Sequence, residues 1–510
     1  MTLRNRLNLI VFALAALIGL SAAALGGLFV TPRKTAEAKG PSGASSSQQQ
    51  AATQQQAATQ QTTAAQTKQA ARRAIVISLD GLDVRYLRRA DELGLRIPTL
   101  RRLMREGVVA GVVSVYPSIT YPNHTAMVTG ALPARHGIFG NMLFDPSEPN
   151  AERGHWFARD IRADTLWDAA ARGGLKTALV SWPVAGGAGD WNAPEIWKPG
   201  GTQEDTLAEI KRHARPAGLI DEIAAHDPEL FRRVTKDEQD DMRTRFAEYI
   251  VAEKRPALLL VHLFDLDHFE HDYGPFTPEA VAMLEKVDGY VGRLLAAAER
   301  AGTLDETTVF IVSDHGFKDF RQRIHPGVVL REAGLVNVRE GVTGTAWGED
   351  DKEVKESAAV TEWRALPYVT GGAAAVILRD AGDREASRRA RAALERAAVR
   401  DGRRLFRVLD AREVRRLGSN TRAAFMLEAE RGYAFGTNLT GRLVTDSRIR
   451  GMHGYLPHPE DYRATFVASG AGVTRRGDLG TVRMTEVGPT VADALGLTLR
   501  DAEGRPVRLR

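Results

Sequence analysis

Short apolar runs rich in β-branched residues alternate with amphipathic segments along most of the chain. In one such segment, Pro278 to Ala301, apolar residues recur at helical spacing and predict a long helix. Alternation of this kind is typical of a mostly parallel sheet covered by helices on both faces. We therefore expect a doubly wound α/β fold, with strands at Ala74 to Leu79, Val108 to Tyr116, Lys176 to Trp182, Ala257 to Phe264 and Thr308 to Ser313.

The N-terminal segment has a different pattern, in which basic residues flank an uncharged apolar run from Leu9 to Val30. Residues 1–34 therefore predict either a signal peptide or an uncleaved anchor that spans a membrane. Both alternatives export the rest of the chain to the periplasm or the extracellular space. The second alternative also tethers it to the membrane.

Residues 35–72 consist largely of Gln, Ala, Thr and Ser. Such a composition cannot bury enough apolar surface to offset the entropy that is lost on ordering. We expect a disordered linker here, followed by a folded domain over residues 73–510.

The charge balance and the cysteine count limit the kinds of ligand that the chain can bind. Lys and Arg number 69 against 64 Asp and Glu, and no run of basic residues interleaved with aromatics stands out. We therefore expect no nucleic-acid-binding patch. The chain has no cysteine, so any metal must bind to histidines and carboxylates.

Three of the predicted strands end in acidic residues. Asp80 follows the first strand, Asp267 lies just beyond the fourth, and Asp314 and His315 follow the fifth. A lone aspartate after a strand is commonly a turn former, but ligand sites in parallel sheets gather at the carboxyl ends of strands. Asp267 and His271 are four residues apart, so a helix would turn both to one side. These donors are of the type that zinc takes.

Five sequence motifs surround these residues: SLDG at 78–81, YPSITYPNHTAMVTGALPARHGIFGN at 116–141, DHFEHDYGP at 267–275, SDHG at 313–316 and GMHGYLP at 451–457. In this order they resemble the nucleotide pyrophosphatase/phosphodiesterase family of the alkaline phosphatase superfamily. Because the motifs bracket most of residues 73–510, the resemblance implies an alkaline-phosphatase-like catalytic domain over this range.

The resemblance also implies a hydrolase with two zinc ions. The implied ligands are Asp267, His271 and His453 for one ion, and Asp80, Asp314, His315 and Thr120 for the other. Thr120 matches the family's nucleophile, and Asn141 matches its asparagine on the oxyanion side. The expected reaction is cleavage of a phosphodiester or pyrophosphate bond, in nucleotides or related diesters, through a phosphothreonine intermediate.

The expected reaction requires an activated nucleophile and a hydrogen-bond donor to the phosphate oxygens. A threonine hydroxyl is a weak nucleophile, and metal coordination is one of the few ways to activate it near neutral pH. Asn141 would donate a hydrogen bond to a nonbridging phosphate oxygen. By local rules alone, Thr120 is also compatible with a turn before a helix at His124 to Thr129, and Asn141 is compatible with a turn as well.

The residues around the nucleophile specify the substrate less closely. Family members that hydrolyse nucleotides commonly carry a lysine before the nucleophile and a tyrosine ahead of the first zinc-binding aspartate, where this chain has Ile119 and His262. Tyr121 keeps an aromatic ring that can stack on a base, and Trp182 is a second apolar candidate. We expect Tyr121, Asn141 and Trp182 to bind a small-molecule phosphodiester or nucleotide.

Residues 317–450 separate the fourth motif from the fifth. We expect them to form an inserted subdomain, with a strand at Pro367 to Leu378 and a helix at Arg384 to Val399.

Three alternative functions compete with this hypothesis. A sulfatase on the same fold would need a C/S-x-P-x-R motif, but the chain has no cysteine and Ser118 is followed by Ile-Thr-Tyr. A phosphomonoesterase or phosphonate hydrolase with the same zinc ligands stays open as the enzymatic alternative. A tethered, non-catalytic binding domain is the remaining alternative, and missing ligands would be its mark; all seven are present.

Overall fold

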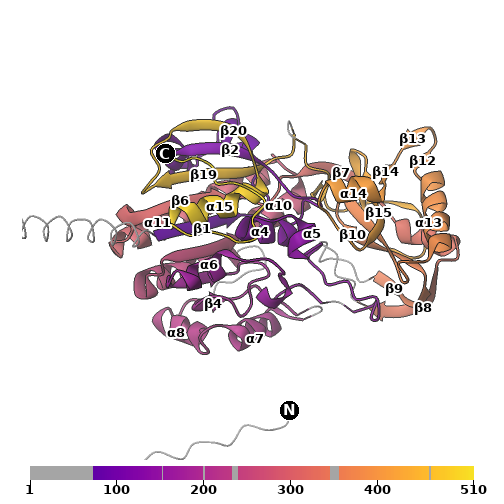
Figure 1. Cartoon of the computed structure of the whole chain (residues 1–510), viewed down its shortest axis with the longest axis horizontal. Coiled ribbons are helices and arrows are strands. Elements are labelled where there is room, and N and C mark those ends of the chain that lie inside the picture. Colours follow the sequence, from indigo (N-terminus) through magenta and orange to yellow (C-terminus); the bar gives the residue numbers. More distant parts are fainter. Residues whose placement is uncertain (1–72, 152, 199–200, 232–238, 345–354, 459–460) are drawn as a thin grey trace, which may run out of the picture. The chain divides into compact units, whose positions relative to one another are not determined.

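The first predicted strand forms β1 (Arg73–Leu79), which lies inside an eight-stranded sheet in a computed structural model of the chain (Figure 1). The order of the sheet is β20 (Gly477–Arg483), β2 (Val108–Val113), β19 (Ala464–Gly470), β6 (Thr307–Val312), β1, β5 (Leu258–Leu263), β3 (Thr177–Val180) and β4 (Trp191–Ala193). Among these strands, β19 runs antiparallel to both of its neighbours, and all other pairs are parallel.

The structure describes residues 73–151, 153–198, 201–231, 239–344, 355–458 and 461–510. The predicted signal peptide or anchor at 1–34 and the predicted linker at 35–72 lie outside this part of the chain. Within it, no helix combines the length and apolar character needed to cross a bilayer.

Two hydrophobic cores cover the two faces of the sheet. Ile75, Ile77 and Leu79 of β1 point into one core, and Ala74 and Val76 point into the other, because successive side chains of a strand alternate between faces. The first core is shared with α2 (Val84–Arg88), α3 (Pro98–Glu106), α7 (Gln203–His213), α8 (Leu219–His226), α9 (Gln239–Tyr249), α10 (Asp265–Tyr273) and α11 (Pro278–Arg300). The second is shared with α4 (Thr120–Thr129), α6 (Leu166–Arg172) and α15 (Met484–Ala494).

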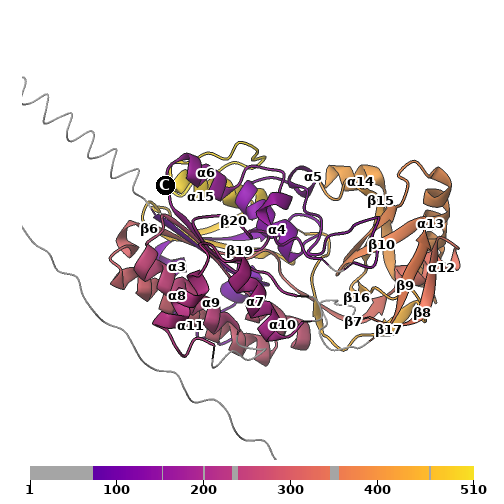
Figure 2. The ribbon, with the colours of Figure 1, turned by 90° about the horizontal axis from the view of Figure 1, so that it is seen from below.

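Figure 2 shows these two groups of helices on opposite sides of the sheet. The prediction of a doubly wound, mostly parallel α/β fold is therefore confirmed. All five predicted strands exist, although their ends differ from the predicted ones by up to three residues. The second, for example, ends at Val113, and Pro117 in the loop beyond it has no N–H to offer a sheet. The long helix predicted at Pro278 to Ala301 is α11, which begins with Thr277 as its N-cap and Pro278 in the first turn.

Residues 317–450 build small sheets of their own. One has the order β10 (Ala365–Thr370), β11 (Ala373–Leu378), β15 (Ala423–Ala429) and β14 (Phe406–Leu409). Another joins β7 (Lys318–Ile324) to β16 (Gly432–Phe435), β17 (Val444–Asp446) and β18 (Gly451–Met452). The hairpins β8 (Val336–Gly344) with β9 (Lys355–Trp363) and β12 (Val399–Arg400) with β13 (Arg403–Arg404), together with the helices α12 (Pro326–Glu332), α13 (Arg384–Ala397) and α14 (Ala411–Arg416), complete the segment.

The prediction of a single strand at Pro367 to Leu378 is wrong, because this range contains two antiparallel strands, β10 and β11. The pair turns at Gly371, which has a φ of 68° that residues with a side chain rarely adopt. The helix predicted at Arg384 to Val399 is confirmed as α13, two residues shorter at its end.

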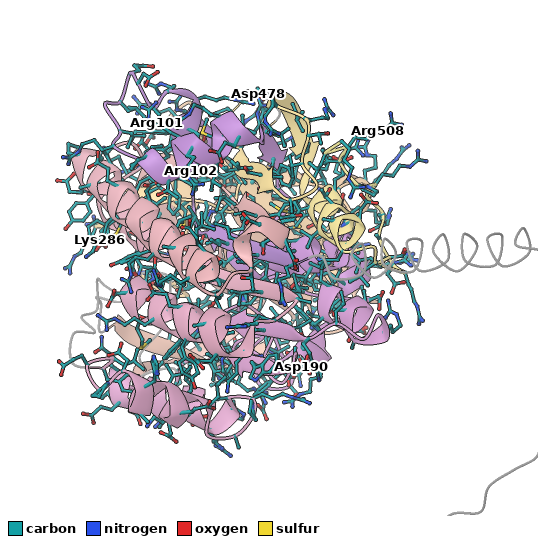
Figure 3. All side chains as sticks on the ribbon, turned by 90° about the vertical axis from the view of Figure 1, so that its left-hand side faces the viewer. Arg101, Arg102, Asp190, Lys286, Asp478 and Arg508 are labelled. Atoms are coloured by element: carbon teal, nitrogen blue, oxygen red, sulfur yellow. The ribbon has the colours of Figure 1, made fainter. Side chains whose placement is uncertain are left out.

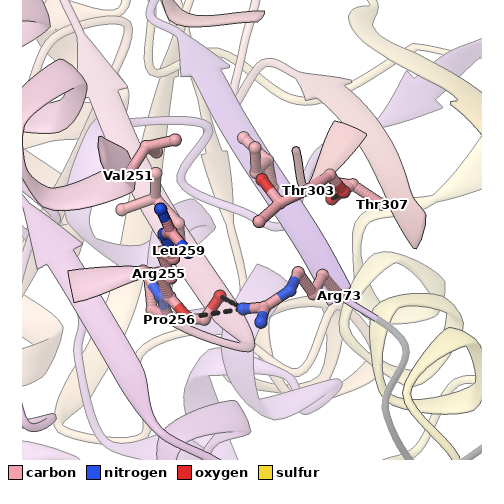
Figure 4. A pocket seen from close by; sticks show the side chains of 8 residues that line it. Arg73, Val251, Arg255, Pro256, Leu259, Thr303 and Thr307 are labelled. Atoms are coloured by element: carbon pink, nitrogen blue, oxygen red, sulfur yellow. Dashed lines mark hydrogen bonds between the residues drawn. The ribbon is translucent and has the colours of Figure 1, made fainter. Parts of the chain in front are cut away.

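Away from the carboxyl edge of the main sheet, the described surface is mixed in charge. Figure 3 shows Arg101, Arg102 and Lys286 interspersed with acidic side chains such as Asp190 and Asp478. Near the start of β1, a recess between Arg73 and Val251 has room for only about 10 Å³ (Figure 4). That volume holds one water molecule at most.

Candidate active site

Three neighbouring strands bring acidic residues to one edge of the main sheet. Asp80 directly follows β1, α10 with Asp267 begins just after β5, and Asp314 and His315 follow β6. Since these strands are parallel and adjacent, their carboxyl ends meet at the same edge. The predicted ligands Asp80, Asp267, His271, Asp314, His315 and His453 are all buried, and they form two groups.

The first group, which we name the helix cluster, consists of Asp267, His271 and His453. Asp267 and His271 lie on one side of α10, four residues apart, as predicted. His271 Nε2 lies 3.2 Å from His453 Nε2 and 3.6 Å from Asp267 Oδ2. His271 Nδ1 donates a hydrogen bond of 3.0 Å to the carbonyl of Gly451, which leaves Nε2 as the nitrogen with a lone pair for a metal.

The second group, which we name the strand-end cluster, consists of Asp80, Asp314 and His315. His315 Nε2 lies 3.3 Å from Asp80 Oδ1 and 3.1 Å from Asp314 Oδ2. Neither ring nitrogen of His315 has a hydrogen-bond partner among the described residues. Buried polar atoms without partners are costly, so this arrangement suits a bound cation.

The two clusters adjoin each other. The rings of His315 and His453 stack with their centroids 3.8 Å apart, and His315 Nε2 lies 4.0 Å from Asp267 Oδ1. Two cations held this close can act on the same phosphoryl group.

Two of the three residues in the strand-end cluster, Asp314 and His315, have pKa values shifted toward the uncharged form. Burial raises the pKa of Asp314 well above its usual range, and the charge of Asp80 raises it further. Burial lowers the pKa of His315 well below its usual value, and His453 lowers it further. A cation among these groups would favour the ionised carboxylate and the neutral ring, which are the metal-binding forms.

Thr120 is the first residue of α4, so the helix begins four residues earlier than the segment His124 to Thr129 that local rules favour. His124 fixes this first turn: Nδ1 donates to the carbonyl of Thr120 at 2.9 Å, and Nε2 accepts from the hydroxyl of Ser78 at 2.8 Å. Burial lowers the pKa of His124 to about 3, so the ring is neutral and can accept. Because Ser78 is two residues ahead of Asp80, the contact ties Thr120 to the strand-end cluster.

Asn141 lies beside the same turn. Its Oδ1 accepts a hydrogen bond of 3.0 Å from the backbone N–H of Tyr121. The amide NH₂ group of Asn141 therefore points away from Tyr121 and keeps its two donors. Its predicted role as a donor to phosphate stays a prediction.

Tyr121 and Trp182, the two aromatic residues predicted to contact the substrate, are both buried. Tyr121 is 3% exposed, packs against Ile138 and Val184, and donates from its hydroxyl to Glu195 Oε1 at 2.9 Å. Trp182 is 1% exposed and belongs to the second core of the sheet, with its ring edge against His124. The core position of Trp182 offers no free ring face to a ligand, so the structure gives the predicted substrate contact no support.

Sequence reasoning missed Glu195 and left His262 as a departure from the family pattern. His262, on β5, donates from Nε2 to Asp80 Oδ2 at 3.0 Å and from Nδ1 to Glu195 Oε2 at 2.9 Å. Burial opposes the charge of His262, but the carboxylates of Asp80 and Glu195 outweigh it and raise its pKa to about 10. Glu195 lies two residues beyond β4, so the strand-end rule could have found it had this three-residue strand been recognised.

Comparison with known proteins identifies the family. Residues 74–456 match the family model described as type I phosphodiesterase / nucleotide pyrophosphatase. The chain belongs to this family. A pyrophosphatase/phosphodiesterase of Schizosaccharomyces pombe, named as uncharacterized, is 28% identical over 256 residues, which cover 48% of this chain and 44% of the relative. Human ectonucleotide pyrophosphatase/phosphodiesterase family member 1 is 26% identical over 257 residues, 48% of this chain and 23% of the relative.

Solved structures of this family extend the likeness to the fold. Human ectonucleotide pyrophosphatase/phosphodiesterase 5 has a TM-score of 0.57 at 17% identity, over 85% of this chain and 97% of that structure. The murine protein, solved as an inactive variant in complex with AMP, has a TM-score of 0.55 over the same shares of the two chains. By contrast, the matched segment spans less than half the length of the two sequence relatives.

Proposed function

We propose that this chain hydrolyses phosphodiester or pyrophosphate bonds with two zinc ions and Thr120 as the nucleophile. The observation that carries the proposal is the pair of adjoining, buried His/carboxylate clusters beside a threonine at the start of a helix. Each cluster supplies three ligands, and catalytic zinc sites typically use three protein ligands and keep a further position open. Membership of the family supports the same reaction class.

The residues present fit zinc by their chemistry. Imidazole nitrogens and carboxylate oxygens are zinc ligands, and six of them meet here without a lysine, an arginine or a thiol in either cluster. Asp267, His271 and His453 would hold one ion, and Asp80, Asp314 and His315 would hold the other together with Thr120. When bound, the ions would stabilise the negative charge of the attacking and leaving oxygens.

The chain's own residues would carry the first half of the reaction. The hydroxyl oxygen of Thr120 would attack phosphorus, and the bond to the leaving group would break, so that a phosphothreonine would form. The proton lost from the hydroxyl would end on the departing oxygen, directly or through solvent. Thr120 lies at the N-terminus of α4, where the helix dipole favours the negative charge of a phosphate. The NH₂ group of Asn141 would donate to a nonbridging oxygen.

In the second half, a water molecule would attack the phosphothreonine from the side that the leaving group vacated. Thr120 would then depart as the leaving group and recover its proton. Since each half inverts the configuration at phosphorus, the complete reaction would retain it.

Nucleotides or related diesters are the proposed substrates. The names of the relatives refer to nucleotide pyrophosphatases, and one structural neighbour was solved with AMP. The open alternative is a phosphomonoesterase or phosphonate hydrolase with the same ligands, and the uncharged neighbours of Thr120 argue against a dianionic substrate.

Export to the periplasm or the extracellular space is part of the proposal. Several relatives are named as ectoenzymes or as venom phosphodiesterases. The apolar run from Leu9 to Val30 supports export through a signal peptide or an anchor, and it lies outside the described residues.

The decisive experiment combines metal analysis with a substrate panel. The full chain should contain about two zinc ions and should hydrolyse a nitrophenyl nucleoside diester, and chelation should abolish the activity. An active protein with one zinc or none would contradict the metal assignment. A metal-loaded protein with no activity on diesters would contradict the proposed reaction.

A further inference from the structure

One carboxylate beyond the two clusters contacts both sides of the proposed site. Glu195 Oε1 accepts from the hydroxyl of Tyr121, and Glu195 Oε2 accepts from Nδ1 of His262, each at 2.9 Å. His262 in turn donates from Nε2 to Asp80 Oδ2. The result is an unbroken chain of hydrogen bonds from the residue after Thr120 to a predicted metal ligand.

The arm through His262 determines which oxygen of Asp80 faces a metal. Oδ2 is occupied by His262, whereas Oδ1 lies 3.3 Å from His315 Nε2, inside the strand-end cluster. The backbone of His262 is fixed because it lies opposite Ser78 in the register of β5 and β1. Its ring orientation, however, depends on the acceptors of Nδ1, which are Glu195 and the carbonyl of Ser181 at 3.1 Å.

The arm through Tyr121 acts on the nucleophile's turn. The backbone N–H of Tyr121 is held by Asn141, and its hydroxyl is held by Glu195, so this residue is fixed at both ends. Thr120 precedes it directly, at the first position of α4.

We propose that Glu195 is a positioning residue that aligns the strand-end cluster with the nucleophile. Through His262 it orients the Asp80 carboxylate for a divalent cation, and through Tyr121 it fixes the turn that carries Thr120. This inference rests on the proposed two-zinc function. Loss of a direct hydrogen-bond partner of a metal ligand typically changes metal affinity about 10- to 100-fold; here that partner is His262, whose ring Glu195 orients.

Position and charge can be separated by two substitutions. Glu195→Ala removes both arms, that is, the hydrogen bonds that Glu195 accepts from His262 and from Tyr121. In Glu195→Gln the side-chain oxygen can accept from His262 while its NH₂ group donates to the Tyr121 hydroxyl, so the geometry is kept and the charge is lost. Glu222→Ala is a matched control, because Glu222 also accepts from a tyrosine hydroxyl, that of Tyr249, but occupies an exposed position of α8.

The test measures zinc affinity on the metal-depleted full chain by competition with a chromogenic chelator, and kcat and KM on a nitrophenyl nucleoside diester. Glu195→Ala should weaken one of two zinc sites at least about tenfold and lower kcat by a similar factor. Glu195→Gln should stay within about threefold of wild type, and Glu222→Ala should match it. Tyr121→Phe, which breaks only the second arm, should keep both zinc affinities and KM and lower kcat.

Three outcomes would overturn the inference: wild-type zinc affinity and kcat in Glu195→Ala, a loss in Glu195→Gln as large as in Glu195→Ala, or an unchanged kcat in Tyr121→Phe. If Glu195→Ala does not fold, the kcat of Tyr121→Phe still tests the inference. Weakened zinc binding in Glu195→Ala together with an inactive wild type would refute the proposed reaction and keep the metal-positioning arm. Failure of the wild-type chain to bind zinc would refute both.

Discussion

The two His/carboxylate clusters are built in different ways, although they adjoin each other. The strand-end cluster takes all three residues from the ends of β1 and β6, just beyond their last residues, and these strands are hydrogen-bonded neighbours in the main sheet. The helix cluster takes two residues from α10 and the third, His453, from the chain that returns after residues 317–450. One cluster is therefore fixed by the pairing of two strands, and the other depends on how a distant segment docks.

Contacts of residues 317–450, which we call the inserted segment, hold His453 in place. The N–H of Gly372 donates to the carbonyl of His453 at 2.8 Å, and β18 pairs with β7 just ahead of it. Glu428 on β15 accepts from the N–H of Leu456 at 2.8 Å and from the Tyr116 hydroxyl at 3.0 Å. The inserted segment thus supports the helix cluster, whereas Asp80 and Asp314 of the strand-end cluster contact residues of the main sheet and its helices.

The largest expected effect comes from removing the nucleophile while leaving both clusters intact. Thr120→Ala should lower the rate of diester hydrolysis at least about a hundredfold, because the attacking oxygen is lost. The protein should still fold and bind zinc at both clusters, and Thr120→Ser should keep part of the rate. An active Thr120→Ala protein would mean that water attacks the substrate directly.

Removing His453 should separate the two clusters. His453→Ala should lower the zinc content from about two ions to about one, since the helix cluster keeps only two ligands. The remaining ion should stay in the strand-end cluster, and the phosphothreonine should accumulate because its hydrolysis is slowed. Metal analysis and phosphate labelling after rapid quenching measure both effects; an unchanged zinc content would remove His453 from the ligand set.

A glycine substitution should test whether the inserted segment supports the helix cluster. A Cβ at Gly371 would lie 2.3 Å from the carbonyl oxygen of His453, whereas one at Gly402 would meet nothing within 4 Å, and both glycines have a positive φ. Both alanine variants carry a backbone strain of about 1–3 kcal/mol. Gly371→Ala alone should weaken one zinc site, about tenfold or more; equal zinc affinities in the two variants would show that docking of this segment does not matter.

The neighbours of Thr120 should favour singly charged substrates over doubly charged ones. Ile119 and Tyr121 carry no positive charge, so the second negative charge of a monoester gains no partner from them. We expect kcat/KM for a nitrophenyl nucleoside diester to exceed that for nitrophenyl phosphate at least tenfold, or about 1.4 kcal/mol. A preference for the monoester would favour the phosphomonoesterase alternative.

The smallest expected effect is a pH dependence of stability through Glu428. Burial raises its pKa from 4.5 to about 7, so between these values the folded protein holds a proton that the unfolded chain has released. Stability should fall as the pH rises through this window and level off above it, by up to about 3 kcal/mol. Glu428→Gln does not titrate at this position, so its melting temperature relative to wild type should be higher at pH 8 than at pH 5. Glu395→Gln, at an exposed position of α13, is the control variant.

The sequence by itself determined the parts of this site that depend on local pattern. Apolar runs predicted the strands, the rule of strand ends pointed to Asp80, Asp267 and Asp314, and the spacing of four residues placed His271 beside Asp267. The resemblance to the family added His453 and Thr120, which lie too far along the chain for any spacing rule. The structure then brought the six His and Asp residues together in the two expected groups.

Only the tertiary structure decided which side chains support these residues. The burial of Trp182, the pairing of Glu195 with His262 and the contact of Gly372 with His453 join segments that are far apart in sequence. Pattern and spacing report on neighbours along one strand or helix. Contacts between strands, by contrast, depend on the order in which the sheet assembles, and β4, with three residues, is too short to leave a periodic signal.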